Sequence, residues 1–276
     1  MAKIISIAHA NPDRCLTQQE LWGNLNILKK LSPMEKKFYK KFMLNEGIEK
    51  RYLALDDIKD IFCEDQDLII ARYSQAAAKL SSMSSQRAVN KAGIGKERIG
   101  CVVTASCTGY LCPGLSSYII EKTGLRPDVS VFDLQGMGCG AALPALSAGA
   151  GYLASSRDNS CALITCTEIC SAAVYWDSDP GLILSNSIFA DGSASVVLSP
   201  DQDAAGLDII DYCVINLPQA REALRFKIDK GKLRNVLSKE VPQIVSKAVK
   251  AVVGALLEKN SLRKEEVKYW AIHSGG

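Results

Sequence analysis

One cysteine of this 276-residue chain stands where the backbone can make a thiol reactive. Cys139 lies between Gly138 and Gly140, after the strand-like stretch 129–134 and before a run of small and apolar residues that predicts a helix. The first N–H groups of a helix are unpaired, and with the helix dipole they favour a nearby negative charge. This position favours the thiolate, the nucleophilic form of cysteine. We therefore interpret Cys139 as a nucleophile, the alternative being a cysteine that only packs.

The helix predicted to follow Cys139 has no polar face, because Gly, Ala, Leu and Ser make up nearly all of residues 140–155. A helix that is small or apolar on every side is normally buried on every side. We therefore expect it between two layers in the middle of the molecule. Pro144 has no backbone N–H, so the helix is expected to begin later than Cys139 or to bend near Pro144.

A nucleophilic cysteine needs a proton acceptor, which is most often histidine. The chain has two histidines. His9 follows the first predicted strand, and a capping or surface role is the simpler interpretation. His273 ends a predicted strand directly before Ser274-Gly275-Gly276, where its ring can face a cleft. We predict that His273 is the catalytic partner of Cys139.

Strands and helices alternate along the chain, which predicts α/β layers. Up to residue 168 we expect strands at 4–8, 98–106, 129–134 and 161–168, and helices within 16–51, 64–92 and about 115–123. Beyond it we expect a hairpin at 187–199 with its turn at Asp191-Gly192, a strand at 206–216, a helix at 233–260 that Pro242 divides or begins, and a strand from 267.

An internal repeat divides the chain. The stretch KAGIGKERIGCVVTAS (91–106) aligns without gaps with KNSLRKEEVKYWAIHS (259–274), at an offset of 168 residues (259 − 91). We interpret the repeat as a duplicated half-domain, with an N-terminal half at 1–200 and a partial second half at 201–276. A complete second copy would need on the order of ninety further residues.

The overall composition argues against several classes of function. The net charge of +3 does not indicate a nucleic-acid partner. No apolar run reaches the ~18 residues that a membrane span needs. The N-terminal apolar stretch is too short for a signal peptide, so we expect a cytoplasmic protein whose ten cysteines are reduced. The cysteines form no CxxC pair and have no histidine nearby in the sequence, which argues against a metal site.

Six stretches resemble, in order, the conserved blocks of type III polyketide synthases, the chalcone synthase-like enzymes. They are TASCTGYLCPG, LQGMGCGAALPAL, TCTEICSAA, SIFADGSASVVLS, VLSKEVPQIV and KYWAIHSGG, and the likeness covers essentially the whole chain. The MGC triplet and SNSIF are also similar to plant ketoacyl-CoA synthases, a cousin family. Both families have the thiolase-like fold, so the resemblance implies a duplicated αβαβα fold whose second half is incomplete.

The resemblance implies a decarboxylative Claisen condensation. Cys139 would accept an acyl starter from a CoA thioester. Malonyl-CoA would lose CO₂ beside His273, and its enolate would attack the Cys139 thioester, which is covalent catalysis in two steps. No cofactor is implied beyond the acyl-CoA and malonyl-CoA substrates, and a homodimer is expected.

The resemblance also assigns residues to the substrates. Phe189 matches one of the gatekeeping aromatics of the family, and Thr108 and Cys170 match positions that line the reaction cavity. Lys37, Lys40 and Lys41 match cations that bind the CoA phosphates, although a solvated helix face is the simpler alternative for them. The second gatekeeping aromatic falls near Asn235, which is not aromatic. The third catalytic residue of the family, an asparagine, lies beyond the His-x-Gly-Gly block, and we therefore expect little condensing activity from these 276 residues alone.

Two other functions stay open. A non-catalytic thiolase-fold partner of a complete subunit would have no need to keep both Cys139 and His273. A cysteine hydrolase with a nucleophile elbow fits the order of nucleophile, acid (Asp211) and histidine, but Ala141 breaks the G-x-C-x-G pattern. A zinc or redox cysteine protein has the least support.

Overall fold

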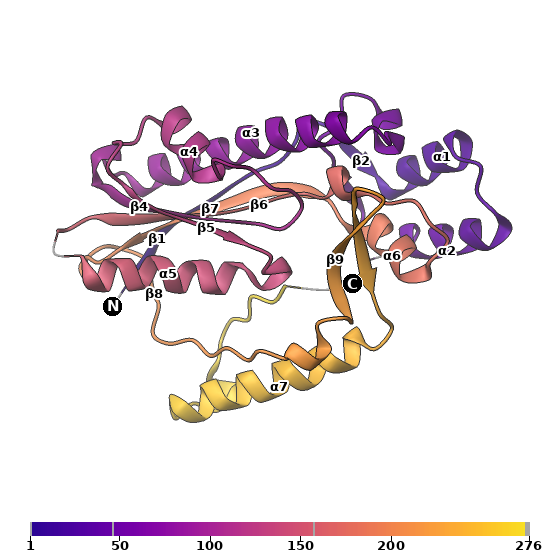
Figure 1. The fold of residues 1–276 in the computed structure, drawn as a ribbon. Coiled ribbons are helices and arrows are strands. Elements are labelled where there is room, and N and C mark those ends of the chain that lie inside the picture. Colours follow the sequence, from indigo (N-terminus) through magenta and orange to yellow (C-terminus); the bar gives the residue numbers. More distant parts are fainter. Residues whose placement is uncertain (1, 46, 157, 274–276) are drawn as a thin grey trace.

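A six-stranded mixed sheet forms the centre of the molecule (Figure 1). Its strands are β1 (Lys3–Ala10), β4 (Ile99–Ser106), β5 (Ser130–Gln135), β6 (Cys161–Ile169), β7 (Asp191–Ser199) and β8 (Leu207–Asp208). They lie in the order β5-β4-β6-β7-β1-β8, with β4 parallel to β5 and β6 and the other pairs antiparallel. The computed structural model describes residues 2–45, 47–156 and 158–273.

Helices cover both faces of this sheet. α3 (Gln66–Ala92) and α4 (Leu115–Thr123) lie on one face, and α5 (Ala142–Ser155) lies on the other (Figure 1). β4 is buried along its whole length, as expected for a parallel strand that is covered on both faces. The α/β layers predicted from the sequence are therefore confirmed.

α3 approaches the sheet closely because its inner face carries small hydroxyl side chains. Ser84 Oγ lies 2.7 Å from Ser193 Oγ and 2.7 Å from Ser195 Oγ, both on β7. Ser85 Oγ lies 2.8 Å from Thr165 Oγ1 on β6. All five residues are buried, so their hydroxyls bind one another in place of water. This network fixes the position of α3 along the middle of the sheet.

A second group of helices lies beside one end of the sheet (Figure 1). It contains α1 (Gln18–Leu28), α2 (Pro33–Met43) and α6 (Pro180–Ile188), with the short strands β2 (Cys15–Thr17) and β3 (Lys50–Tyr52). α1 and α2 each begin at a Ser/Thr–Glu capping box. α2 packs on α6, and Tyr39 and Ile183 belong to the core that the two helices share.

The C-terminal part is a hairpin followed by a long helix. The hairpin consists of β9 (Leu224–Asp229) and β10 (Lys232–Leu237), and the helix is α7 (Val241–Lys259). α7 has no buried residue and lies on the side of α5 that faces away from the sheet (Figure 1). The division at residue 200 stays a prediction, and β8 beyond it joins the central sheet.

The internal repeat is visible in part. The 3₁₀ turns η2 (Lys96–Arg98) and η6 (Lys264–Glu266) follow α3 and α7 at the predicted offset, since 264 − 96 = 168. β4 follows η2, but residues 267–273 after η6 form no strand. The strand predicted from 267 is therefore wrong over its described residues, because no neighbouring strand pairs with it there.

Three other sequence-based expectations are wrong. Residues 187–199 are not a hairpin, since α6 ends at Ile188 and Asp191-Gly192 lie inside β7. Only Leu207–Asp208 of the stretch 206–216 is a strand. Residues 233–237 belong to β10 instead of a helix, and Pro242 marks the first turn of α7, one of the two outcomes expected for it. Strand pairing overrode the turn signal at Asp191-Gly192 and the helix signal at 233–237, whereas most of 206–216 found no strand to pair with.

α5 is not buried on every side, contrary to the prediction. It contacts β4, β6 and β7 through one face, where Ala145, Gly149 and Leu153 are buried. On its outer face Leu143 is 59% exposed, because no second layer of the described chain covers it.

Within the described ranges no helix is long and apolar enough to cross a membrane. The same residues contain no group of three or more His, Cys, Asp or Glu side chains that could hold a metal ion.

Candidate active site

Cys139 lies in a 3₁₀ turn, η3 (Gly138–Gly140), between the end of β5 and the start of α5. Gly138 adopts a positive φ of 55°, a conformation that other residues disfavour, which explains the glycine before the cysteine. α5 begins only at Ala142, so the later start expected from Pro144 is confirmed. The Cys139 residue is exposed to solvent.

Glu168, near the end of β6, ties the loop after β4 to the sheet. Its carboxylate accepts hydrogen bonds from the backbone N–H of Cys107 (3.0 Å), the backbone N–H of Thr108 (3.0 Å) and Thr108 Oγ1 (2.7 Å). Thr108 Oγ1 in turn accepts one from the N–H of Ile169 (2.8 Å). Burial raises the pKa of Glu168, and these hydrogen bonds oppose the rise. Thr108, predicted to line a cavity, is thus buried, and its hydroxyl is hydrogen-bonded to Glu168.

The surroundings of Cys139 do not favour its thiolate. Although the residue is exposed, neighbouring atoms partly bury the sulfur, which raises the pKa of Cys139, and the negative charge of Glu168 raises it further. Only the hydrogen bond to its own backbone N–H acts in the opposite direction. The expectation of a thiol acidified by the start of a helix is therefore wrong, because α5 begins three residues later and a carboxylate lies nearby.

Three further cysteines surround this region, and all are less accessible than Cys139. Cys107 follows β4, Cys166 lies within β6, and Cys170 begins the 3₁₀ turn η4 (Cys170–Ala173). Burial raises the pKa of Cys107 and raises that of Cys166 to about 11. Burial, together with the charges of Asp191 and Glu168, holds the pKa of Cys170 far above its ordinary value. Of the four thiols, Cys139 is the one that a substrate can reach from solvent.

Phe189 is positioned by a buried arginine. It caps the C-terminal end of α6, and its carbonyl accepts a hydrogen bond from Arg51 Nη1 at 2.8 Å. Arg51 also donates to the carbonyl of Asn186 (2.8 Å) and to Gln18 Oε1 (3.1 Å). Burial lowers the pKa of Arg51 to about 10, so its cation persists at neutral pH. The segment around Phe189 is therefore rigidly attached to β3.

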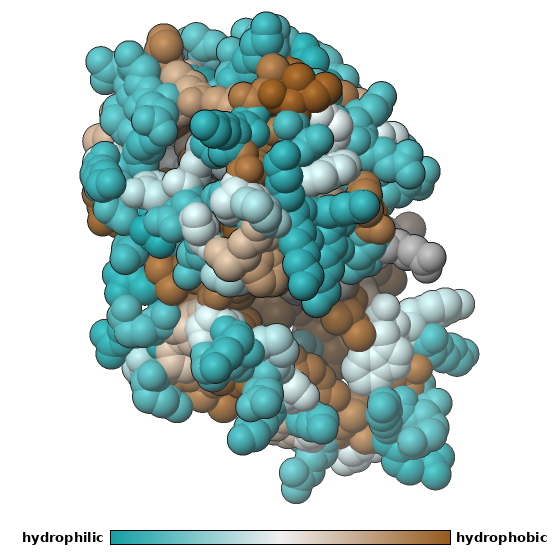
Figure 2. All heavy atoms as spheres, turned by 90° about the vertical axis from the view of Figure 1, so that its right-hand side faces the viewer, coloured by the Kyte–Doolittle hydropathy of each residue, from teal (hydrophilic) through white to brown (hydrophobic). Residues whose placement is uncertain are grey.

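The remaining predicted residues do not join this cluster through any described contact. Lys37, Lys40 and Lys41 lie on the exposed face of α2. His273 is exposed, and no hydrogen bond or ion pair of a described residue involves it. The pairing of His273 with Cys139 stays a prediction, and Ser274, Gly275 and Gly276 lie outside the described residues. Figure 2 shows a hollow on the side of the molecule that holds α2, α6 and the hairpin, with apolar atoms at its floor and hydrophilic atoms around it.

Three charged residues of this region, Glu168, Arg51 and Asp191, were not among the site residues predicted from the sequence. Glu168 is the only charged residue in the strand CALITCTEI, and a lone charge in a buried strand is a usable signal. The buried Asp191 carboxylate accepts hydrogen bonds from the N–H groups of Ala54 (2.6 Å) and Ser171 (2.8 Å). The sequence Asp191-Gly192 is typical of a turn, so it did not indicate that the Asp191 carboxylate is a buried hydrogen-bond acceptor in β7.

Comparison with known proteins identifies a family. The profile of the family described as FAE1/Type III polyketide synthase-like protein matches residues 6–272. The 3,5-dihydroxyphenylacetyl-CoA synthase of Streptomyces toyocaensis is 30% identical over 244 residues, which cover 84% of this chain and 62% of that protein. The alpha-pyrone synthesis polyketide synthase-like Pks18 of Mycobacterium tuberculosis is 26% identical over 100% of this chain and 72% of its own length.

Solved structures show the same fold. The 1,3,6,8-tetrahydroxynaphthalene synthase of Streptomyces coelicolor A3(2), a bacterial type III polyketide synthase, superposes with a TM-score of 0.88 at 19% identity over 99% of this chain and 78% of that chain. PKS-I of the brown alga Ectocarpus siliculosus gives a TM-score of 0.87 at 24% identity over 98% and 76%. The chain spans about 62–64% of the length of the first three curated relatives.

Proposed function

Because the chain belongs to the FAE1/type III polyketide synthase-like family, we propose that it catalyses the decarboxylative condensation of malonyl-CoA onto an acyl-CoA starter. The observation that carries the proposal is the exposed Cys139 thiol in a strand-to-helix turn, beside a loop that Glu168 holds against the sheet. The less accessible thiols of Cys107, Cys166 and Cys170 lack this access to a substrate.

Chemistry at Cys139 requires a base, since burial and Glu168 keep its thiol protonated near neutral pH. In our proposal the imidazole of His273 takes the thiol proton, and the thiolate attacks the acyl-CoA carbonyl. The carbon–sulfur bond to CoA breaks, the CoA sulfur takes the proton from His273, and CoA leaves as a thiol. Malonyl-CoA then loses CO₂, and its enolate carbon attacks the acyl group on Cys139. A carbon–carbon bond forms and the Cys139 thiolate is released.

The proposed substrate contacts follow the positions of the remaining residues. Lys37, Lys40 and Lys41 form a row of exposed cations on α2, which suits the phosphates of CoA. Phe189 and Cys170 lie at the ends of α6 and β6, where they would border the acyl chain. Thr108 would line the same cavity through its methyl group, since its hydroxyl is bound to Glu168.

The test is to incubate the protein with a series of acyl-CoA thioesters and measure the mass of the intact chain. We expect one acyl adduct on the wild-type chain, located on Cys139 after proteolysis, and none on Cys139→Ala. Cys15→Ser is the matched control, because Cys15 is also exposed but lies on β2. Acylation of Cys139→Ala as fast as the wild type, or of no variant with any thioester, would contradict the proposal.

We further propose that these 276 residues acylate Cys139, and condense malonyl-CoA onto that acyl group, more slowly than a complete relative does. The reason is that His273 stands on a segment without strand partners and makes no described contact. Steady release of condensed product from malonyl-CoA, at the rate of a complete relative, would refute this. A non-catalytic partner subunit would show no acylation at all, which separates the two functions.

The oligomeric state and the cellular location belong to the same proposal. A homodimer is favoured by the outer strand β5, where Val131 and Phe132 are 46% and 42% exposed at the edge of the sheet. Sedimentation equilibrium would detect it, and a single monomeric species at all concentrations would exclude it. A cytoplasmic location agrees with ten cysteines that are all free thiols.

A further inference from the structure

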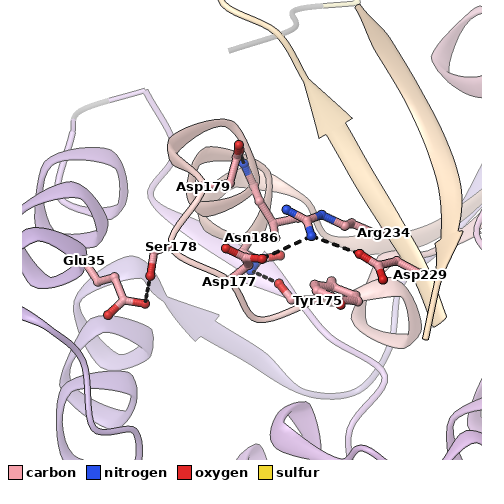
Figure 3. A network of polar contacts seen from close by, with 9 residues as sticks. Glu35, Tyr175, Asp177, Ser178, Asp179, Asn186, Asp229 and Arg234 are labelled. Carbon is pink, nitrogen blue, oxygen red and sulfur yellow. Dashed lines mark hydrogen bonds and ion pairs between the residues drawn. The ribbon is translucent and has the colours of Figure 1, made fainter. Parts of the chain in front are cut away.

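Arg234 lies at the centre of a polar network between the β9–β10 hairpin and the segment before α6 (Figure 3). Its Nη1 is 3.0 Å from Asp229 Oδ2 on β9 and 3.1 Å from Asp177 Oδ2 in that segment. The guanidinium also lies 5.1 Å from the ring centroid of Tyr175. With its side chain 20% exposed, Arg234 is partly buried, and it links the hairpin to the body of the protein through the Asp177 carboxylate and the Tyr175 ring.

The anchor to which Arg234 binds is itself rigid. Tyr175 is buried, and its carbonyl accepts a hydrogen bond from Asn186 Nδ2 on α6 at 2.9 Å. Asn186 Nδ2 also lies 3.3 Å from the hydroxyl of Tyr39 on α2. The segment around Tyr175 is therefore fixed to both α6 and α2, and Arg234 transmits that fixed position to the hairpin.

The opposite face of the hairpin meets the elements that carry the proposed acyl-binding residues. Neighbouring residues of a strand point to opposite faces, so Asn235 faces away from the Arg234 network. The buried Asn235 donates its Nδ2 hydrogen bond to Ser185 Oγ on α6. Phe226 is the cross-strand partner of Asn235 and shares its face. β10 contacts both α6, which ends before Phe189, and η4, which begins at Cys170.

We infer that Arg234 is a positioning residue that sets the size of acyl group the site admits, by holding Asn235 and Phe226 of the hairpin against α6. The inference rests on the proposed condensing function for its substrate and on the Arg234 network for its mechanism. If the Arg234 cation is removed, the hairpin keeps its own strand pairing and the contact of Lys232 with the Tyr175 ring, but loses its ion pair with Asp177. The wall then moves away from α6, and longer acyl chains fit.

The experiment compares Arg234→Met with Arg225→Met, a control on β9 whose ion pair with Glu222 is on the surface. Cys139 acylation is measured with acyl-CoA thioesters of increasing chain length, and hydrogen exchange is followed in residues 224–237. For Arg234→Met we expect the ratio of long-chain to short-chain acylation to rise by about tenfold, the lower end of the discrimination that one methylene gives in an apolar pocket. We also expect faster exchange in the hairpin, while Arg225→Met behaves like the wild type.

A further variant tests the same wall without changing a charge. A Cβ at Gly181 would lie 2.1 Å from the carbonyl oxygen of Leu237, so Gly181→Ala must push β10 away from α6. It should shift chain-length preference in the same direction as Arg234→Met, whereas Arg234→Lys should fall between the wild type and Arg234→Met. Alkylation of Cys139 by iodoacetamide should stay within about twofold in all variants, which excludes general unfolding.

The outcomes separate this inference from the proposed function. Unchanged chain-length preference in Arg234→Met, with the wild type acylated normally, overturns the positioning role and leaves the condensing function intact. Failure of every thioester to acylate the wild type overturns the condensing function and with it the substrate part of the inference. Hydrogen exchange then tests whether Arg234 holds the hairpin in place. Unchanged protection of residues 224–237 in Arg234→Met would overturn that role of Arg234 as well.

Discussion

Gly149 lets α5 approach the sheet, and its replacement by alanine should cost stability. A Cβ built at Gly149 would lie 2.9 Å from Ile164 Cδ1 and 3.4 Å from Leu198 Cδ1, both in buried side chains of β6 and β7. Gly151, on the same helix, has no atom within 4 Å of such a Cβ. The two glycines therefore have the same helix propensity and different surroundings.

The expected magnitudes follow from these distances. Alanine is about 1 kcal/mol more favourable than glycine inside a helix, so Gly151→Ala should stabilise the protein by about that amount. Gly149→Ala makes the same gain but overpacks the core, which costs about 1–3 kcal/mol. The free energies of unfolding of the two variants should thus differ by about 1–3 kcal/mol.

Thermal unfolding monitored by circular dichroism measures the difference. A change of 1 kcal/mol moves the midpoint by about 2–4 °C in chains near this length, so Gly149→Ala should melt several degrees below Gly151→Ala. Equal stabilisation of both variants would refute the close approach of α5 to Ile164.

Three further outcomes are expected. Because Glu168 raises the pKa of Cys139, Glu168→Gln should increase the rate of iodoacetamide alkylation of Cys139 at pH 8. In the wild type this rate should still rise as the pH passes 9, where an ordinary thiol of pKa ~8.5 is already mostly ionised. Ser84→Ala removes the Ser84 hydrogen bonds with Ser193 and Ser195 in the buried hydroxyl network, and should lower the free energy of urea unfolding by about 1–3 kcal/mol. Lys79→Ala removes a surface ion pair on α3 and should change that free energy by less than about 1 kcal/mol.

The first half of the fold follows from the sequence because its elements are set by local pattern. The predicted helix about 115–123 coincides with α4, and the strand at 98–106 coincides with β4 within one residue. The hairpin of β9 and β10 was missed although Lys230-Gly231, both with positive φ, form its turn. Residues 233–237 fit a helix or a strand equally well, and pairing with β9 decides between them.

The site was predictable only where one stretch of chain defines it. The turn around Cys139 and the later start of α5 follow from Gly138, Gly140 and Pro144 alone. The pKa of Cys139 does not, since it depends on Glu168 of β6, and no local pattern shows that these two residues are neighbours. The same limit applies to Arg234, whose carboxylate partner Asp177 lies far from it in sequence.

Glu168 links the structure of the site to its chemistry. Its carboxylate accepts hydrogen bonds from two backbone N–H groups and the Thr108 hydroxyl, which hold the loop after β4 against the sheet. The same charge raises the pKa of Cys139, which makes the thiol a poor nucleophile by itself. A cation or base must therefore act on Cys139 during catalysis, and of the two histidines only His273 is proposed for this role. The proposed role therefore requires the His273 ring to come within hydrogen-bonding distance of the Cys139 sulfur, a contact that the described residues do not show.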